Sequence, residues 1–205
     1  MCASARGYAA GNHTTGDEAG YDCPPRDEAG RRADLVAFRS SLQQAVARRD
    51  AAAVLKVTDP GIRTSFGTDD GLAFFERDLR DKRGQIWDDL ADVLSGGGSF
   101  ESPDSFRAPF WFGCADAEMR EIIVVGTGVR ARARPSAGAR VLAVVSYAVL
   151  KGQEPFPSNA WAEVQLKDGR RGFIAGKYIR GPIGYRAYFS KINGSWRLMT
   201  FIGGD

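Results

Sequence analysis

Apolar residues recur along the chain with two different periods. Between residues 31 and 95 they are spaced three and four apart, which predicts helices. We expect the first helix to begin at Asp34 as N-cap. Its apolar stripe consists of Leu35, Phe38, Leu42, Ala45 and Val46. Three further helices are expected over residues 51–57, 72–79 and 85–94, and the run 96–98 of three glycines ends the last of them.

Short apolar runs of strand length interrupt and follow these helices. A brief strand is expected over residues 62–66, and an aromatic-rich one over residues 106–112, where Pro109 indicates a sheet edge. From residue 121 to residue 183, short apolar runs alternate with polar turns, which predicts a small all-β barrel. Asn193-Gly194 then joins two apolar runs, the strongest short-range signal for a hairpin.

The all-β segment resembles the bacterial SH3-like domain. The matching residues are Val129-Arg130-Ala131-Arg132 before Pro135-Ser136, Val141 to Tyr147, Trp161 with Val164, the Gly169, Gly172, Phe173 and Ile174 hairpin, and Tyr178-Ile179. The segment departs from the family at Ala148, where glycine is usual, and in the long loop 151–159. The resemblance implies a module that binds peptides or cell-wall material and performs no chemistry.

The remaining elements resemble the cone-shaped α+β fold of the nuclear-transport-factor-2-like superfamily. The resemblance lies in residues 45–55 and in Asn193-Gly194-Ser195-Trp196-Arg197-Leu198. It implies an α+β protein with a tail over residues 1–30, a first domain of residues 31–120 plus 184–205, and the SH3-like barrel of residues 121–183 inserted before the final hairpin. Two domains in series, with the hairpin extending the barrel, is the alternative.

The two parts of the chain carry opposite charge. The sequence has 28 Lys/Arg and 25 Asp/Glu, a net charge of +3. Residues 121–205 hold 13 basic and 5 acidic residues, whereas residues 1–120 hold 15 and 20. A basic half suits an anionic partner such as a cell-wall polymer; nucleic acid is a weaker option, which predicts strong salt dependence. A solvated barrel surface beside an acidic neighbour is the bland alternative.

Ligand binding by the barrel would rest on aromatic side chains and an arginine row. The predicted aromatic contacts are Tyr147, Phe156, Trp161 and Tyr178. The predicted cationic contacts are Arg130, Arg132 and Arg134, which alternate on one strand and can grip carboxylates or phosphates. The structural alternative places Trp161 in the barrel core and lets Arg132 clamp a loop carbonyl.

Catalytic constellations are hard to find in this sequence. His13 is the single histidine and lies in the tail, which argues against a Ser-His-Asp or Cys-His arrangement. The run Gly126-Thr127-Gly128 lacks the third glycine and the helix of a nucleotide loop. If the cone-shaped domain held an enzymatic or small-molecule pocket, the candidates would be Asp69, Asp70 or Asp88 with Tyr185 or Tyr188. Asp69-Asp70 fits better as a helix cap, and Asp88-Asp89 as a solvated helix face.

Three cysteines bear on location rather than on metal binding. Cys2, Cys23 and Cys114 lie far apart, so no metal site or cofactor is expected. Cys23 and Cys114 could form a disulfide in an exported protein, or remain two thiols. Cys2, before a polar stretch, resembles the lipidated cysteine of a lipoprotein, although no signal peptide and no apolar run of ~20 residues is visible. The alternative is that Cys2 is an incidental residue of the tail. We therefore predict a non-enzymatic envelope protein that binds peptidoglycan or a partner's peptide.

Overall fold

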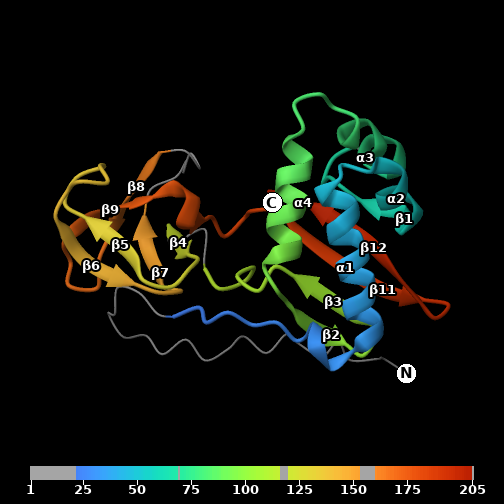
Figure 1. The fold of residues 1–205 in the computed structure, drawn as a ribbon, viewed down its shortest axis with the longest axis horizontal. Helices are drawn as coiled ribbons and strands as arrows, with labels where there is room; N and C mark the ends of the chain where they lie inside the picture. The colour runs from blue at the N-terminus through green and yellow to red at the C-terminus, as the bar shows by residue number, and fades with distance from the viewer. Residues whose placement is uncertain (1–21, 69, 116–119, 153–159, 205) are drawn as a thin grey trace, which may run out of the picture.

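The computed structural model describes residues 22–68, 70–115, 120–152 and 160–204. Over these ranges the chain is an α+β protein built as two units that lie side by side (Figure 1). One unit combines four helices with a five-stranded sheet, and the other is all-β with a seven-stranded sheet. Cys2, His13, Asp69 and Phe156 lie outside the described residues.

The four helices follow the predicted stripes. They are α1 (Ala33–Ala47), α2 (Ala51–Lys56), α3 (Leu72–Leu79) and α4 (Gln85–Ser95). The Asp50 carboxylate caps α2 by accepting a hydrogen bond from the Ala53 amide at 3.0 Å. The N-cap of α1 is Arg32, so the prediction of Asp34 was wrong: Asp34 lies in the first turn, where its negative charge suits the positive end of the helix dipole.

The first unit's sheet draws strands from both sides of the all-β segment. Its strands are β1 (Thr58–Arg63), β2 (Ser99–Ser102), β3 (Ser105–Ala108), β11 (Arg186–Ile192) and β12 (Ser195–Ile202). Their order is β1-β12-β11-β3-β2, with β1 parallel to β12 and the other pairs antiparallel. Asn193 and Gly194 both have positive φ, as the turn between β11 and β12 requires. The final hairpin therefore lies in the first unit's sheet.

Two strand predictions need correction. The aromatic-rich strand ends at Ala108 rather than Phe112, because Pro109 cannot donate a further ladder hydrogen bond. That strand, β3, is an interior strand between β11 and β2, so Pro109 does not mark an edge. The strand expected over residues 62–66 instead spans Thr58–Arg63, with Pro60 inside it.

A continuous apolar core fills the space between the helices and this sheet. Its largest fully buried side chains include Phe75, Phe106, Phe189 and Phe201. The rings of Phe38 and Phe189 meet edge to face at 5.7 Å, which joins α1 to the sheet. These side chains fill the interior between the helices and the sheet.

The second unit is an open sheet. Its strands are β4 (Glu121–Val124), β5 (Val129–Arg132), β6 (Val141–Val145), β7 (Val149–Gly152), β8 (Trp161–Gln165), β9 (Arg171–Ala175) and β10 (Ile179–Arg180). Their order is β10-β4-β7-β8-β9-β5-β6, and over the described ranges no pairing joins β10 to β6. The predicted closed barrel is therefore not found. Two residues of β10 present too short an edge to close it, while the buried face still forms one apolar core.

An extended segment ties the two units together. Residues 22–28, which we call the strap, bridge to Ala148 of the all-β unit through Asp22 and to Gly98 of the α+β unit through Asp27. Cys23 and Cys114 form a disulfide, and Cys23 packs with Trp111 in a small apolar cluster at the junction. Residues 22–30 were predicted to belong to a loose tail, and this part of the prediction is wrong, because they make bridges to both units and begin a short helix at Ala29.

Candidate functional site

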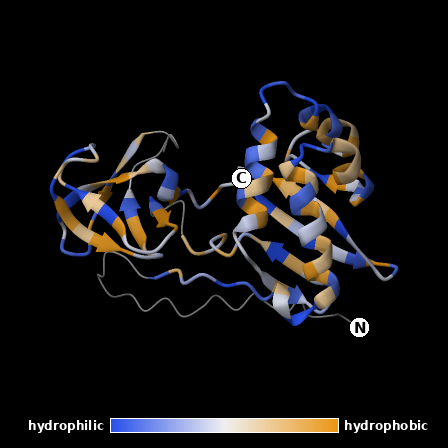
Figure 2. Cartoon of the chain, in the orientation of Figure 1, coloured by the Kyte–Doolittle hydropathy of each residue, from blue (hydrophilic) through white to orange (hydrophobic). Residues whose placement is uncertain are grey.

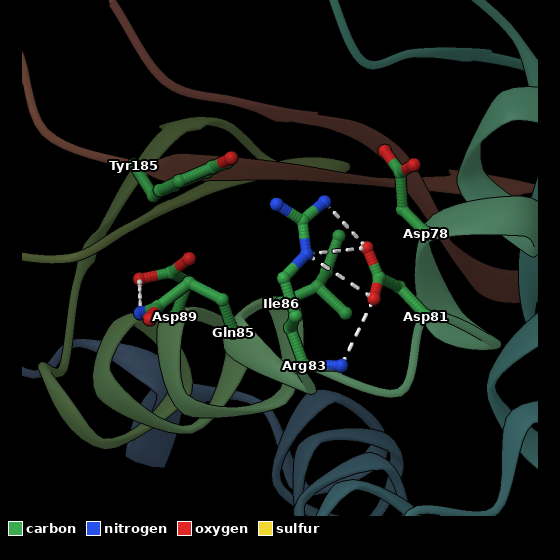
Figure 3. Close-up of a pocket in the computed structure, with 7 residues that line it drawn as sticks. All are labelled: Asp78, Asp81, Arg83, Gln85, Ile86, Asp89 and Tyr185. Carbon is green, nitrogen blue, oxygen red and sulfur yellow. Dashed lines mark hydrogen bonds and ion pairs between the residues drawn. The ribbon is translucent and has the colours of Figure 1, made fainter.

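The α+β unit carries a hollow of about 430 Å³ at its rim. The lining residues are Asp78, Asp81, Arg83, Gln85, Ile86, Asp89 and Tyr185 (Figure 3). They come from the end of α3, the turn after it, the first half of α4 and the segment that enters β11. We call this hollow the acidic pocket, because it holds three carboxylates and one arginine.

Hydrogen bonds fix the walls of the acidic pocket. The Asp81 carboxylate accepts from the Arg83 amide at 2.9 Å and from its guanidinium at 2.7 Å, so the turn between α3 and α4 is tied to itself. The buried Trp87 indole donates to the Leu79 carbonyl at 3.1 Å, which fixes α4 against the end of α3. The acidic side chains therefore lie at the corner between α3 and α4, which these hydrogen bonds hold in place.

Tyr185 forms the opposite wall. Its ring stacks on Phe201 with centroids 4.8 Å apart and planes at 15°. Gly203 lies against the same ring, and a Cβ there would be 3.2 Å from it. The glycine and Phe201 thus hold the ring in place, and its hydroxyl faces the space occupied by the Arg83 guanidinium (Figure 3).

Burial and like charge shift two pKa values in the acidic pocket. Desolvation raises the pKa of Asp89, the hydrogen bond from Gln85 lowers it, and the charges of Asp88 and Asp92 raise it further. Burial also raises the pKa of Tyr185, and the negative charge of Asp89 adds to this. Because burial makes ionisation of Asp89 unfavourable, a cation bound beside it would stabilise the ionised carboxylate more than it would at an exposed position.

Of the acid and tyrosine candidates predicted for a cone-shaped domain, Tyr185 alone lines this pocket among the described residues. The Asp70 carboxylate accepts hydrogen bonds from the backbone amides of Thr64 and Gly71 and so holds the loop before α3 together. It does not cap α3 through its side chain, so the prediction of a helix cap was wrong for Asp70. Asp88 is exposed and lies 3.8 Å from Arg49, as expected of a solvated helix face. Tyr188 lies opposite Arg107 on the sheet.

The sequence contains few signals that could have identified the other residues of the pocket. Asp89 was assigned with Asp88 to a solvated helix face, yet the structure leaves Asp88 exposed and half-buries Asp89. The available signal was the helical spacing of Gln85, Ile86 and Asp89, which places all three on one side of α4. Asp78, Asp81 and Arg83 carried no signal of their own.

The predicted binding residues of the all-β unit are dispersed. Arg130 and Arg134 are exposed, as a contact to an anionic ligand requires. Arg132 instead donates to the Ala139 carbonyl at 2.7 Å, which is the structural alternative foreseen for it. The Tyr147 ring meets Phe110 at 6.0 Å, at the junction of the units.

The two remaining aromatic contacts that the structure describes lie in different surroundings. Trp161 is partly buried on β8, opposite Ala175. Tyr178 is exposed beneath the Lys177 ammonium, 5.0 Å from the ring centroid. A second hollow, of about 280 Å³, does open on this unit, but none of the predicted residues that the structure describes lines it. Its lining is Lys151, Gly152, Glu163, Val164, Gln165 and Arg171.

Two kinds of site are absent from the described part of the chain. No group of three or more His, Cys, Asp or Glu side chains there is arranged to hold a metal ion. Within the same residues, no helix is both long enough and apolar enough to cross a bilayer.

Comparison with known proteins adds a likeness of fold. No family model matches the chain, and no curated protein matches it. Two NTF2-like α+β structures are similar. One is an NTF2-like protein of unknown function from Shewanella oneidensis MR-1, with 12% identity, TM-score 0.31, and 84% of this chain and 97% of that chain covered.

The other similar structure is a substituted variant of Rd1NTF2_05. It has 11% identity and a TM-score of 0.28, and covers 82% of this chain and 95% of that chain. Neither structure, and no family model, supports an SH3-like domain.

Proposed function

We propose that the α+β unit binds a small cationic molecule in the acidic pocket, and that the all-β unit is an accessory to it. The half-buried carboxylate of Asp89 beside Tyr185 is the observation that carries this proposal. Asp78 is paired with Arg77 and Asp81 with Arg83, whereas no described cation forms an ion pair with Asp89, so its charge is the one left for a ligand to neutralise. Burial, and to a smaller extent the charges of Asp88 and Asp92, raise the pKa of Asp89, and an amine or guanidinium group bound beside it would stabilise the ionised carboxylate.

The lining also defines the size and shape of the ligand. The Tyr185 ring offers an aromatic face for a cation, and Ile86 offers a small apolar surface beside it. A volume of about 430 Å³ lies in the range of small-molecule sites. We therefore favour a compact cation on a short apolar stem over a polymer.

Binding is favoured over catalysis because the pocket holds no assembled proton relay. The described hydrogen bonds place Gln85 on the Asp89 carboxylate at 3.3 Å and none between Asp89 and Tyr185. An isomerase or dehydratase would need such groups positioned on its substrate. The pocket thus favours ligand binding, and an isomerase or dehydratase activity is the alternative.

The test uses n-butylguanidine and n-butylamine as probes, with butyrate as an anion of similar size. Titration by NMR should show saturable shifts around α4 with both cations and none with butyrate. Asp89→Asn and Tyr185→Leu should each weaken binding, by about tenfold for the charge change. Asp88→Asn is the matched control, since it removes the same charge from an exposed neighbouring position. Equal binding by all variants, or none by the parent, would overturn the proposal.

A second candidate function belongs to the all-β unit: recognition of peptidoglycan in the cell envelope by an SH3-like module. The exposed guanidinium groups of Arg130 and Arg134 favour it, because they are free to meet an anionic polymer. The disulfide between Cys23 and Cys114 fits export to an oxidising compartment. A pull-down on purified sacculi tests this candidate. Binding that persists in a folded Arg130→Ala/Arg134→Ala variant and in Trp161→Ala would count against it.

A further inference from the structure

The two sheets have four edge strands in the described part of the molecule, and three of them are protected. Strand β1 contains Pro60 between charged Asp59 and Arg63. Strand β2 is covered by the strap, because the Phe100 amide donates to the Glu28 carboxylate at 3.0 Å. Strand β10 has only two residues, and its Arg180 is bound to Asp92 of the other unit.

The fourth edge, β6, lacks these protections. Its five residues, Val-Leu-Ala-Val-Val, include no charge and no proline. Val144 is 63% exposed, the largest value among the large apolar side chains of the described residues, and Val141 is 39% exposed. The strand lies on the outside of the all-β unit (Figure 1) and is largely orange in the hydropathy view (Figure 2). Such an edge readily takes up another strand.

The main chain of β6 is engaged on one side. It pairs with β5, where Arg130 lies opposite Val144. On its other side no described strand pairs with it; a single contact, from the Arg170 guanidinium to the Leu142 carbonyl at 3.3 Å, reaches the strand from the turn before β9. Unpaired amides and carbonyls therefore remain for a partner in extended conformation.

The charge around β6 selects the kind of partner. Arg130 and Arg134 are exposed on or just after β5, and Arg140 is exposed directly before β6. No described carboxylate forms an ion pair with any of these three. A second copy of the chain would bring the same arginines together, which is unfavourable, whereas an acidic peptide would pair with them.

We infer that β6 is a docking edge for an extended, acidic peptide segment of a partner protein, which adds to the seven-stranded sheet as an eighth strand. Main-chain hydrogen bonds to β6 supply affinity. Alternate apolar side chains of the peptide cover Val144 and Val141, and its carboxylates meet Arg130 and Arg140. This inference is independent of the acidic pocket, which lies on the other unit.

The test uses the full chain and a labelled peptide, acetyl-Asp-Val-Thr-Val-Glu-Val-Asp-amide, in fluorescence anisotropy. Binding should saturate, weaken with salt, and be lost for the same peptide with proline at its centre. Val144→Asp should weaken it at least tenfold. Val36→Asp is the matched control, since Val36 is 39% exposed on α1 of the other unit. Unfolding curves establish that both variants fold.

Amide exchange gives a second measurement of the same site. Bound peptide should slow exchange in residues 141–145 and leave the outer edge of β1 unchanged. The inference is overturned if the parent chain does not bind the peptide, or if Val144→Asp binds as well as Val36→Asp. It is also overturned if sedimentation shows concentration-dependent self-association that Val144→Asp abolishes, because the occupant of β6 would then be a second copy.

Discussion

The acidic pocket turns on how differently two neighbouring aspartates are placed. Asp88 is exposed, whereas Asp89 is half-buried beside the Tyr185 ring, and burial raises its pKa. Ionisation of Asp89 is therefore less favourable in the folded chain than in the unfolded chain. The folded state holds the proton to higher pH, and it loses stability as pH rises from the ordinary carboxyl value of about 4 through the raised value.

Asp89→Asn should remove this pH-dependent cost. We expect the variant to have a higher free energy of unfolding than the parent at pH 7. At pH 3, where the carboxyl is protonated in both the folded and the unfolded state, this difference between variant and parent should disappear. Urea unfolding between pH 3 and pH 8 measures the difference. Asp88→Asn is the matched control, because it removes the same charge from an exposed position. Parallel stability curves for the parent and Asp89→Asn would contradict the assignment.

Among the structural elements, the end of α4 depends on glycine for close approach. A Cβ on Gly98 would lie 2.1 Å from the Arg107 carbonyl oxygen, and one on Gly97 would lie 2.4 Å from the Arg26 carbonyl oxygen. The Gly98 carbonyl accepts from the Glu28 amide at 2.9 Å, so the same residue holds the strap. These glycines therefore do more than end a helix.

Gly98→Ala should destabilise the fold by about 2 to 4 kcal/mol, because the backbone of β3 cannot move aside without disrupting the sheet. Gly30→Ala is the matched control, since nothing lies within 4 Å of the position that a methyl group would take there. Chemical unfolding of both variants tests the comparison. A Gly98→Ala protein as stable as Gly30→Ala would mean that β3 and the strap yield easily.

Signals from residues close in sequence predicted the helices and the last hairpin. The other strands could not be predicted in this way, because they depend on pairing with distant parts of the chain. Helix α4 and the Asn193-Gly194 turn are specified by residues close in sequence. Strand β2 is four residues long, three of them polar, and it forms because β3 pairs with it. Barrel closure and the interior position of β3 are likewise decided by partners that no local pattern names.

The candidate site was harder to predict than the fold for the same reason. Tyr185 and Asp89 meet because the final hairpin returns to the first sheet and places Tyr185 beside α4. In the sequence, Asp88 and Asp89 are equivalent acids on one helix. The sheet alone decides which of them is desolvated, so sequence reasoning named the exposed neighbour.

On the scale of the whole molecule, several links hold the two units together. The strap contacts both, and Arg180 of the all-β unit binds Asp92 on α4, with its guanidinium 5.5 Å from the Trp111 ring centroid. The ion pair is partly exposed, with 26% and 38% of the two side chains accessible, so it adds on the order of 1 kcal/mol. The disulfide should contribute more.

Removal of the disulfide by Cys23→Ala/Cys114→Ala should therefore destabilise the chain and free the strap. Cys23 and Cys114 are 91 residues apart, and closing a loop of that length in the unfolded chain accounts for up to about 4 kcal/mol. Urea unfolding of the parent with and without a thiol reductant should reproduce the loss seen in the double variant. Amide exchange should quicken across residues 22–28 while α1 and β11 stay protected, because their core excludes the strap. If the double variant were as stable as the oxidised parent, the Trp111 cluster and the Arg180 ion pair would be enough to hold the two units together.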